Sequence, residues 1–449
     1  MSPKELTTLR NERLHRQMRY QLYAFGPFYR RRMDEAGIGP HGISKVQDLA
    51  KLPPVDRSAL AERLDQFSLR PTRRLIQRWG ASSQLMSVSL EMVLHGSSHS
   101  ESLVRNEYEP VHFLGTAGTS GKAIQINLSK RDLAQLGDQG HRMLEMAGVQ
   151  SGDRILNLLP SGPSGGFWTT WLGGVSLGLD QSAPGPMEPH RVLDHVNQGK
   201  ANVLIADAGI ALGMLQVSWQ PPETLRTIIL APRPGNPSET EALRSAAGSS
   251  LNVVATYHFA EGRAVWSECQ GGAAGGFHTY PDLEIVEVIN PGTGAPARPD
   301  DGGELVFTGL DQRGTALARY RPGDIVSGIQ SGPCPYCGRL VDRIMGPIRR
   351  AGASVKIQVS GAGLVEIDPV ALQSALSHPG LAAWQVQITK PEAGSNGIDD
   401  VFVFFKPNEQ NDPAALAVEL DGVLRQKLGL IPTQFILSDP EDGGLLDLR

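Results

Sequence analysis

Between residues 153 and 257, short apolar runs alternate along the chain with segments of helical periodicity. A short apolar run bounded by turn residues is typical of a buried strand, whereas apolar residues three and four positions apart indicate a helix. This alternation predicts βαβ units, in which helices cover a parallel sheet, and therefore an α/β fold. We expect strands at 153–159, 202–206, 225–230 and 253–257, and helices at 167–177, 209–216 and 239–247.

The pattern changes on both sides of this region. Upstream, residues 5–36 have helical spacing, and after residue 283 the alternating segments separated by Pro-Gly turns are typical of β-hairpins. We interpret 346–352 as a linker, after which strands and helices follow in the order β-α-β-β-α-β of a small ferredoxin-like α+β domain. The chain is therefore expected to form a large N-terminal domain of mixed and parallel sheets flanked by helices, residues 1–345, and a small C-terminal domain, residues 346–449.

Composition excludes several classes of function. The 449 residues include 42 lysines and arginines and 47 acidic residues, and the formal net charge is -5. Because both signs are interspersed, nothing indicates nucleic-acid binding. No apolar run approaches the length of a membrane span, and the N-terminus has no signal-peptide core. The three cysteines do not suit a disulfide framework. These features predict a cytoplasmic protein with neither nucleic acid nor membrane as a partner.

The segment from Thr116 to Lys122 reads Thr-Ala-Gly-Thr-Ser-Gly-Lys. Glycines let backbone N–H groups approach a phosphate, the hydroxyl side chains add donors, and Lys122 adds a positive charge. Strand patterns on both sides place the segment in a hairpin, whereas a Walker A loop opens a helix and has a different glycine spacing. We therefore predict a phosphate-binding loop that is not a Walker A loop. A Gly/Ser turn without a ligand is the alternative.

Cysteine and histidine form a second informative pattern. Cys334 and Cys337 form a C-x-x-C knuckle, whose thiolates can face one metal ion. Cys269 and His278 lie upstream and complete the Cys3His set of a structural zinc site. His258 is an alternative fourth ligand. A redox pair or three unrelated thiols are the competing interpretations, although a redox C-x-x-C belongs in a thioredoxin-like βαβ setting and this one lies in a Gly/Pro-rich loop.

Two acidic residues lie at the ends of predicted strands. Glu261 follows the strand 253–257, and ligand sites of open α/β sheets gather at the carboxyl ends of strands. Its carboxylate is therefore a candidate ligand for magnesium beside a triphosphate. Asp324 precedes another strand, where it is a candidate acceptor for the hydroxyl groups of a ribose. An ordinary turn acid is the alternative interpretation of each residue.

In their order along the chain, the segments 116–122, 257–261 and 320–324 resemble the motifs of adenylate-forming enzymes, which include the acyl- and aryl-CoA synthetases. Shorter fragments are similar to the phenylacetate–CoA ligase branch of that superfamily. These fragments are 27–30, 36–37, 48–53, 165–166, 268–269 and 290–294. The resemblance covers nearly the whole chain apart from about 66–110.

The resemblance implies that ATP and a carboxylic acid give an acyl-adenylate and pyrophosphate, after which a thiol, usually that of coenzyme A, displaces AMP. It implies two catalytic residues, Lys122 at the phosphates and Glu261 at Mg2+. The implied nucleotide-binding residues are Thr116, Gly118, Thr119, Ser120, Gly121, Ala231, Pro232, Tyr257 and Asp324. The implied lining of an acyl pocket for a flat aromatic acid is Phe167, Trp168, His258 and Phe259, with plain core packing as the alternative.

One departure from the family pattern matters for activity. Family members usually carry a lysine in the last segment of the small domain, but here Gly444 falls at that position and no lysine follows Lys427. Loss of that charge is expected to slow adenylation strongly. The alternatives to a CoA ligase are therefore a degenerate homologue that binds nucleotide or acyl ligand, and a condensing enzyme with another nucleophile. The expected partners are a small carboxylic acid and coenzyme A or another thiol carrier, and a homodimer is left open.

Overall fold

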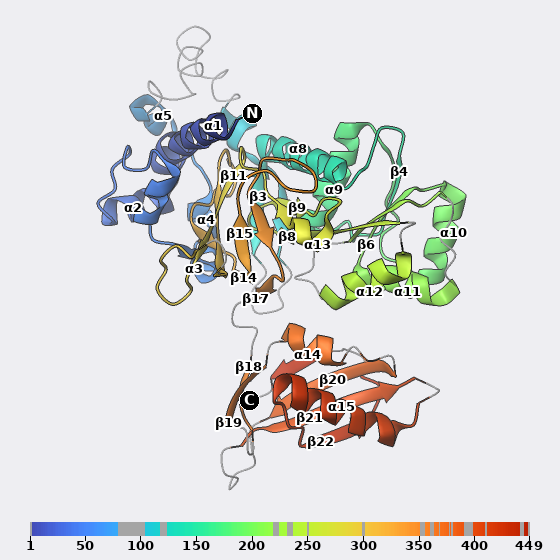
Figure 1. The fold of residues 1–449 in the computed structure, drawn as a ribbon. Helices are drawn as coiled ribbons and strands as arrows, with labels where there is room; N and C mark the ends of the chain where they lie inside the picture. The colour runs from blue at the N-terminus through green and yellow to red at the C-terminus, as the bar shows by residue number, and fades with distance from the viewer. Residues whose placement is uncertain are drawn as a thin grey trace. The chain divides into compact units, whose positions relative to one another are not determined.

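The computed structural model describes residues 2–79, 104–116, 124–218, 224–230, 237–248, 251–298, 301–350, 355–359, 363–367, 369–376, 378, 380–389, 398–408, 411–440 and 444–447. The chain divides into a larger compact unit, Met1–Pro234 with Glu239–Ile348, and a smaller unit that consists mainly of Arg349–Arg449. Figure 1 shows the elements of both units, coloured by residue number. Within the described residues, no helix is both long enough and apolar enough to cross a membrane.

The predicted βαβ region forms part of a sheet to which nine described strands contribute, in the order β15-β16-β10-β9-β8-β7-β6-β4-β5. Strands β5, β4, β6, β7 and β8 are parallel, and the other four continue the sheet through antiparallel pairs. The prediction of a mixed α/β fold is confirmed. The strands are β4 Arg154–Asn157, β5 Asp180–Ser182, β6 Val203–Ala206, β7 Thr227–Leu230, β8 Asn252–Phe259, β9 Ala264–Ser267, β10 Phe277–His278, β15 Gly328–Gln330 and β16 Arg343–Met345.

Helices cover both faces of the parallel strands. Successive side chains of a strand point to opposite faces, so these strands bury apolar side chains on both sides. On β6, Leu204 and Ala206 pack in a cluster with α10, α11 and α12, whereas Val203 and Ile205 pack with α8 and α9. Figure 1 shows α8 and α9 on one side of β6 and α11 and α12 on the other. The helices are α8 Lys130–Met146, α9 Gly165–Leu177, α10 Pro189–Gly199, α11 Ala208–Ser218 and α12 Pro237–Ala247.

Two glycines allow α8 and α9 to pack closely. A Cβ atom on Gly140 would lie 1.9 Å from the carbonyl oxygen of Thr169. A Cβ atom on Gly173 would lie 2.3 Å from the backbone of Gly140. Both distances are well below van der Waals contact, so any larger residue at either position would force the two helices apart.

The N-terminal helices pack on a second sheet of the larger unit, which includes β1, β13, β12 and β14, with β11 paired to β12. The helical pattern predicted for 5–36 is confirmed, but its middle is a π-helix, which the spacing did not indicate. Helix and sheet share a core that includes Leu14, Leu22, Tyr29, Phe307 and Tyr320. The elements are α1 Pro3–Arg16, the π-helix Gln17–Tyr23, α2 Pro27–Glu35, β1 Val55–Asp56, β11 Glu284–Ile289, β12 Gly303–Gly309, β13 Tyr320–Arg321 and β14 Asp324–Val326.

The smaller unit contains a four-stranded sheet in the order β22-β21-β20-β23. The first strand of the predicted β-α-β-β-α-β order is present as β18, but it pairs with β19 in a separate hairpin instead of joining this sheet. β23, which no local pattern predicted, pairs in parallel with β20. Local patterns indicate strands but not their partners. The elements are β18 Val355–Val359, β19 Gly363–Ile367, α14 Pro369–Leu376, β20 Leu381–Thr389, β21 Asp400–Pro407, α15 Pro413–Leu428, β22 Gln434–Leu437 and β23 Gly444–Asp447.

Glu284 is an acidic residue that is buried in the core of the larger unit. Glu284, the first residue of β11, accepts hydrogen bonds from the backbone N–H of Tyr280 at 2.8 Å and from the indole N–H of Trp266 at 2.5 Å. Its Oε2 atom is buried without a hydrogen-bond partner in the described part of the chain. Burial raises the pKa of Glu284 to about 8. The fold therefore favours the protonated carboxyl at neutral pH.

We expect Glu284→Gln, which has the shape of the protonated acid, to change how stability depends on pH. The pKa of Glu284 rises from its ordinary 4.5 to about 8 in the folded protein. Its protonation therefore contributes stability that is complete below about pH 4.5 and is lost as the pH rises to about 8. The variant should lack this loss. The free energy of unfolding of the variant minus that of the wild type should therefore increase from about pH 5 to pH 8.

Urea unfolding at several pH values across this window measures the effect. The exposed Glu12 offers a matched control, since Glu12→Gln should leave the pH dependence of the wild type unchanged. Identical pH dependence in wild type and Glu284→Gln would contradict the prediction.

Candidate functional site

The carboxyl end of β8 and the start of β14 bring two predicted nucleotide-binding residues together. Tyr257, on β8, donates its hydroxyl to a carboxylate oxygen of Asp324, the first residue of β14. Each residue is 2% exposed. A buried carboxylate requires hydrogen-bond donors, and the phenol supplies one of them. The pair therefore holds an acceptor group in a fixed orientation at the end of a parallel strand.

A second cluster surrounds Glu261, just beyond the end of β8. The Glu261 carboxylate forms an ion pair with Arg57 and accepts a hydrogen bond from the hydroxyl of Tyr320 at 3.1 Å. Arg57 also donates a hydrogen bond to the hydroxyl of Thr116 at 3.0 Å. Glu261 is 3% exposed. One guanidinium group therefore joins the predicted magnesium ligand to the first residue of the predicted phosphate loop.

No sequence motif identified Arg57 as a site residue. Arg57 begins α3 (Arg57–Glu62), directly after β1, and β1 pairs in parallel with β13 so that Val55 lies opposite Tyr320. This pairing carries Arg57 to Glu261, far away in the sequence. In the sequence around it, Arg57 is a basic residue at the start of a short helix. No motif spacing relates Arg57 to Glu261 or Thr116.

Thr116 lies at the end of the predicted hairpin, which is confirmed. β2 (Pro110–Gly115) and β3 (Gln125–Ser129) pair in antiparallel fashion. The backbone N–H of Thr116 donates to the carbonyl of Ile124 at 3.1 Å, and its hydroxyl accepts from the N–H of Ile124 at 2.9 Å. The other predicted residues of the loop and of the adenine site lie outside the described residues. These are Gly118, Thr119, Ser120, Gly121, Lys122, Ala231 and Pro232.

Two of the aromatic residues proposed for an acyl pocket are core residues in the structure. Phe259 is buried, with its ring centroid 5.7 Å from that of Trp266 and 5.1 Å from that of Phe307. Phe167 is also buried and stacks on Trp171 at 6.0 Å. Both phenylalanines therefore belong to the packed core and offer little surface to a ligand.

The other two, Trp168 and His258, are half-buried and lie near the start of α9. Gly165 leaves room for the imidazole, since a Cβ atom there would lie 2.1 Å from Nε2 of His258. Burial lowers the pKa of His258 to about 4, so the ring is neutral at pH 7. Trp168 donates its indole N–H to the carbonyl of Gly162 at 3.0 Å. These two side chains, unlike the two phenylalanines, retain surface that a ligand can contact.

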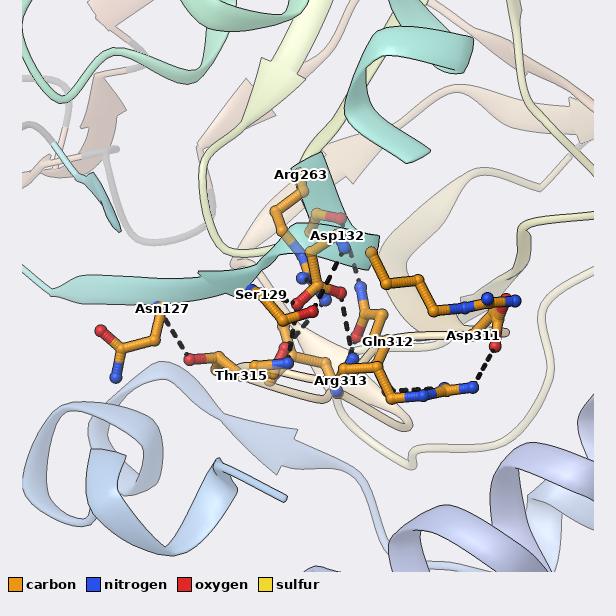
Figure 2. A network of polar contacts seen from close by, with 12 residues as sticks. Asn127, Ser129, Asp132, Arg263, Asp311, Gln312, Arg313 and Thr315 are labelled. Carbon is orange, nitrogen blue, oxygen red and sulfur yellow. Dashed lines mark hydrogen bonds and ion pairs between the residues drawn. The ribbon is translucent and has the colours of Figure 1, made fainter. Parts of the chain in front are cut away.

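A buried carboxylate fixes the loop that carries Glu261 (Figure 2). The Asp132 carboxylate, at the start of α8, accepts three backbone N–H bonds, from Ser129 at 2.8 Å, Arg313 at 3.0 Å and Gly314 at 2.7 Å. It also forms a 2.6 Å ion pair with Arg263, whose φ angle is 62°. Residues other than glycine rarely adopt this left-handed conformation. The ion pair therefore stabilises an unusual backbone conformation close to Glu261.

The side chains of Cys269, His278, Cys334 and Cys337 come together, with their potential ligand atoms all within 4.8 Å of one another. The Sγ atoms of Cys269 and Cys334 are 3.9 Å apart, and Sγ of Cys337 is 3.3 Å from Nε2 of His278. Nδ1 of His278 lies 3.1 Å from the carbonyl oxygen of Gly276. A hydrogen bond there selects the tautomer whose Nε2 can bind a metal. His258, the alternative ligand, is not part of this cluster.

The pKa values of the cluster differ in what they favour: those of His278 and Cys334 favour the forms that bind a cation, and that of Cys269 favours the protonated thiol. Burial lowers the pKa of His278, which favours the neutral imidazole that metals bind. Burial raises the pKa of the Cys269 thiol to about 11. At Cys334 burial acts in the same direction, but hydrogen bonds from the backbone N–H groups of Tyr336 and Cys337 outweigh it and lower the pKa of the thiol. A metal ion would stabilise all three thiolates.

No family model matches the sequence. The phenylacetate-coenzyme A ligase of Thermus thermophilus is 28% identical over 357 residues, which cover 77% of this chain and 70% of that protein. The phenylacetate-coenzyme A ligase of Escherichia coli is 22% identical over 340 residues, which cover 72% and 67%. Both relatives are named for the same activity, the ligation of phenylacetate to coenzyme A.

Solved structures extend the comparison to the fold. A 2-hydroxyisobutyryl-CoA ligase in the postadenylation state matches with a TM-score of 0.76 at 18% identity, over 100% of this chain and 91% of that chain. An O-succinylbenzoate-coenzyme A synthetase from Bacillus subtilis in complex with AMP matches with a TM-score of 0.54 at 16% identity, over 74% and 66%. At these identities the matches establish the fold.

The fold and the sequence relatives define the class of protein: this chain belongs to the adenylate-forming CoA ligase superfamily. Within that class, its sequence is similar to those of the phenylacetate-coenzyme A ligases. The superfamily that the motifs predicted is confirmed.

We expect Asp132→Asn to lower the free energy of unfolding by about 3–5 kcal/mol, because it leaves the buried guanidinium of Arg263 without its counter-charge. Urea unfolding followed by tryptophan fluorescence measures the loss. Asp138→Asn is the matched control on the same helix, since the side chains of Asp138 and its partner Arg142 are 47% and 38% exposed. That control should cost less than about 1 kcal/mol. Equal losses in the two variants would contradict the role assigned to Asp132.

Proposed function

We propose that this protein activates a carboxylic acid with ATP and then transfers the acyl group to a thiol, with coenzyme A as the expected acceptor. The observation that carries the proposal is the linked set of Thr116, Arg57 and Glu261 at the same end of β8 as the Tyr257–Asp324 pair. The names of the sequence relatives support the overall reaction. The matched 2-hydroxyisobutyryl-CoA ligase structure contains R3-HIB-AMP, which supports an adenylate intermediate.

Asp324 and Tyr257 are assigned to the nucleoside. Ribose hydroxyls are donors, and the buried Asp324 carboxylate is an acceptor whose orientation the Tyr257 hydroxyl fixes. Ala231 and Pro232 are assigned to adenine on the resemblance. Because a charged acceptor makes stronger hydrogen bonds than a neutral one, Asp324 is the main determinant of ribose affinity in this proposal.

Glu261 is assigned to Mg2+, because carboxylate oxygen is the ligand that this ion uses beside a triphosphate. The carboxylate is already paired with a cation, the guanidinium of Arg57, and so fits a positively charged ligand. Mg-ATP binding therefore requires Arg57 to give up Glu261. Because Arg57 also contacts Thr116, its released guanidinium stays beside the loop 116–122, where it can pair with phosphate oxygens. A bound Mg2+ would supply neutralisation of phosphate charge.

The proposed chemistry has two displacements. First, an oxygen of the substrate carboxylate attacks the α-phosphorus of ATP, and pyrophosphate leaves with the electron pair of the broken P–O bond. A carboxylate, which is a poor electrophile, thereby acquires AMP as a good leaving group. Second, the sulfur of the thiol attacks the acyl carbon, its proton passes to solvent, and AMP leaves. Lys122 is assigned to the β- and γ-phosphates that depart.

An aromatic or small carboxylic acid is the proposed substrate class. Trp168 and His258 provide the half-buried surface for its acyl group, with Phe167 and Phe259 packed behind them. With a pKa of about 4, His258 is uncharged at pH 7. The acyl site therefore presents a neutral imidazole to the acyl group of the substrate, and it suits an apolar ring or a short chain.

One observation favours a second candidate function. β23 begins at Gly444, where the resemblance expects a lysine, and no lysine follows Lys427. A protein without that charge loses stabilisation of the adenylation transition state but keeps the groups that contact ribose and phosphate. Such a protein would bind ATP or an acyl-adenylate and act as a binding protein, or would use an adenylate with a nucleophile other than coenzyme A.

ATP–pyrophosphate exchange over a panel of aromatic and small carboxylic acids tests the first function. We expect at least one acid to stimulate exchange, and Lys122→Ala to lower the rate by about 10²–10³-fold through loss of a charge at the departing phosphates. The exposed Lys4 offers the matched control, and Lys4→Ala should leave exchange unchanged. Product analysis with and without coenzyme A then identifies the acceptor.

The possible outcomes separate the candidates. Exchange with a defined acid supports the ligase. ATP binding by calorimetry without exchange for any acid supports the second function. Absence of both Mg-ATP binding and exchange would overturn the two proposals together.

We also propose that Cys269, His278, Cys334 and Cys337 hold a structural zinc ion. Three thiolates and one imidazole form a closed tetrahedral set, which leaves no position for substrate, so the ion would contribute folding energy rather than catalysis. The close approach of the four ligand atoms supports this assignment. Reduced thiols persist in the cytoplasm, which is the location we propose for the protein.

Elemental analysis of purified protein should find about one zinc per chain. Cys337→Ser should lose most of the metal and lower the melting temperature, because a neutral hydroxyl binds zinc far more weakly than a thiolate. His195, a partly exposed residue of α10 that lies outside the cluster, provides the control, and His195→Ala should keep the metal. A wild-type protein that is well folded and free of metal would contradict the zinc assignment.

A further inference from the structure

A small cavity of about 100 Å³ lies between the N-terminal helices, the start of α8 and the turn that follows β12. Leu310 is the apolar member of its lining. The polar lining consists of three arginines, two glutamines and one aspartate, namely Arg13, Arg16, Arg131, Gln17, Gln21 and Asp311. None of these residues belongs to the proposed ligase site or to the cysteine cluster. The cavity is therefore a separate polar site with an unusual content of guanidinium groups.

The carboxylate inside the cavity is shared. Asp311 contacts Arg131 at 2.5 Å and Arg313 at 2.8 Å, and Figure 2 shows the Arg313 contact. Arg131 lies 3.7 Å from a carboxylate oxygen of Glu107, which is also the partner of Arg313 at 2.9 Å. Two acids and two arginines thus balance each other here. Asp311 has no charge left over for the other arginines of the lining.

The two remaining arginines differ in how far their charge is neutralised. Arg13 lies 3.7 Å from a carboxylate oxygen of Asp282 and donates a hydrogen bond to the carbonyl oxygen of the same residue at 2.7 Å. Arg142 contacts both Asp282 and Asp138, so these two arginines and two acids also balance each other. Arg16 is exposed and has no ion-pair partner among the residues that the structure describes. The lining therefore carries an uncompensated positive charge at Arg16, whose planar N–H pairs match carboxylate or phosphate oxygens.

Two buried glutamines line the cavity, and Gln17 already donates an amide N–H to the carbonyl of Gln312 at 3.3 Å. Gln17 and Gln21 are 2% and 3% exposed, and both belong to the π-helix. The Oε1 atom of Gln21 accepts a hydrogen bond from the hydroxyl of Tyr108 at 2.9 Å, which leaves the amide N–H2 group as a donor. π-helical turns are rare and occur frequently at functional sites. Here the turn places two amide side chains beside three arginines.

We propose that this cavity binds a small anion through its carboxylate or phosphate oxygens. Arg16 supplies the uncompensated positive charge and is the residue most available for the ligand, and Gln21 supplies a neutral donor. A volume of about 100 Å³ admits inorganic phosphate or a short dicarboxylate. Sites for drug-sized ligands and cofactors are typically about 300–1,000 Å³, so a whole nucleotide does not fit. The proposal does not depend on the ligase activity.

Isothermal titration of the full chain with inorganic phosphate and, separately, with malonate tests this site, with ionic strength held constant by chloride. We expect saturable binding of at least one anion. Arg16→Glu should raise the Kd at least about tenfold, and Arg16→Gln should raise it less, because it removes the positive charge without adding a negative one. Binding of phosphate alone would identify a phosphate site, and binding of malonate alone would identify a carboxylate site.

Two further variants keep the test specific. Phosphate also suits the loop 116–122, so binding in this cavity must persist in Lys122→Ala. Arg298→Glu makes the same charge change at a side chain that is 87% exposed and should leave the Kd unchanged. Saturable binding of neither anion would overturn the proposal. So would binding that Lys122→Ala abolishes and Arg16→Glu keeps, or an equal effect of the Arg16 and Arg298 variants.

Discussion

The buried carboxylate of Asp132 is the interaction on which the architecture of the larger unit most depends. It joins the start of α8, the turn at 313–314 and the guanidinium of Arg263, three segments that are distant in the sequence. A buried charge is tolerated only when its lone pairs are satisfied, because its desolvation is otherwise uncompensated. The contacts therefore form as a set. Their common result is a loop in one conformation, and that loop carries Glu261.

The same requirement shapes the proposed active site. Glu261 is paired with Arg57, and Asp324 accepts a hydrogen bond from the hydroxyl of Tyr257. A ligand must therefore exchange partners with these groups, and only a ligand that replaces the lost contacts binds well. The proposed ligand Mg-ATP would meet this condition, because the metal would replace Arg57 at the carboxylate while phosphate oxygens would accept hydrogen bonds from the displaced guanidinium. This exchange links the proposed metal site to the loop at Thr116.

Particular elements show how far the sequence alone could lead. The strand β8 and the β2–β3 hairpin follow from local periodicity, and both were predicted. Arg57 was not, because its relation to Glu261 depends on the parallel pairing of β1 with β13. The hairpin of β18 and β19 and the edge strand β23 were missed for a similar reason, since strand pairing in the smaller unit is decided between distant segments.

By itself, the sequence determined the kinds of element, the order of the motifs and the chemical types available for phosphate, metal and ribose. Each of these is encoded within a few neighbouring residues by periodicity and side-chain chemistry. The tertiary structure alone decided which distant side chains share a site. It placed Arg57 on Glu261, Phe259 in the core and three arginines around one cavity. Contacts between residues that are distant in the sequence depend on strand pairing and on burial of charge. Local sequence patterns do not encode either of these.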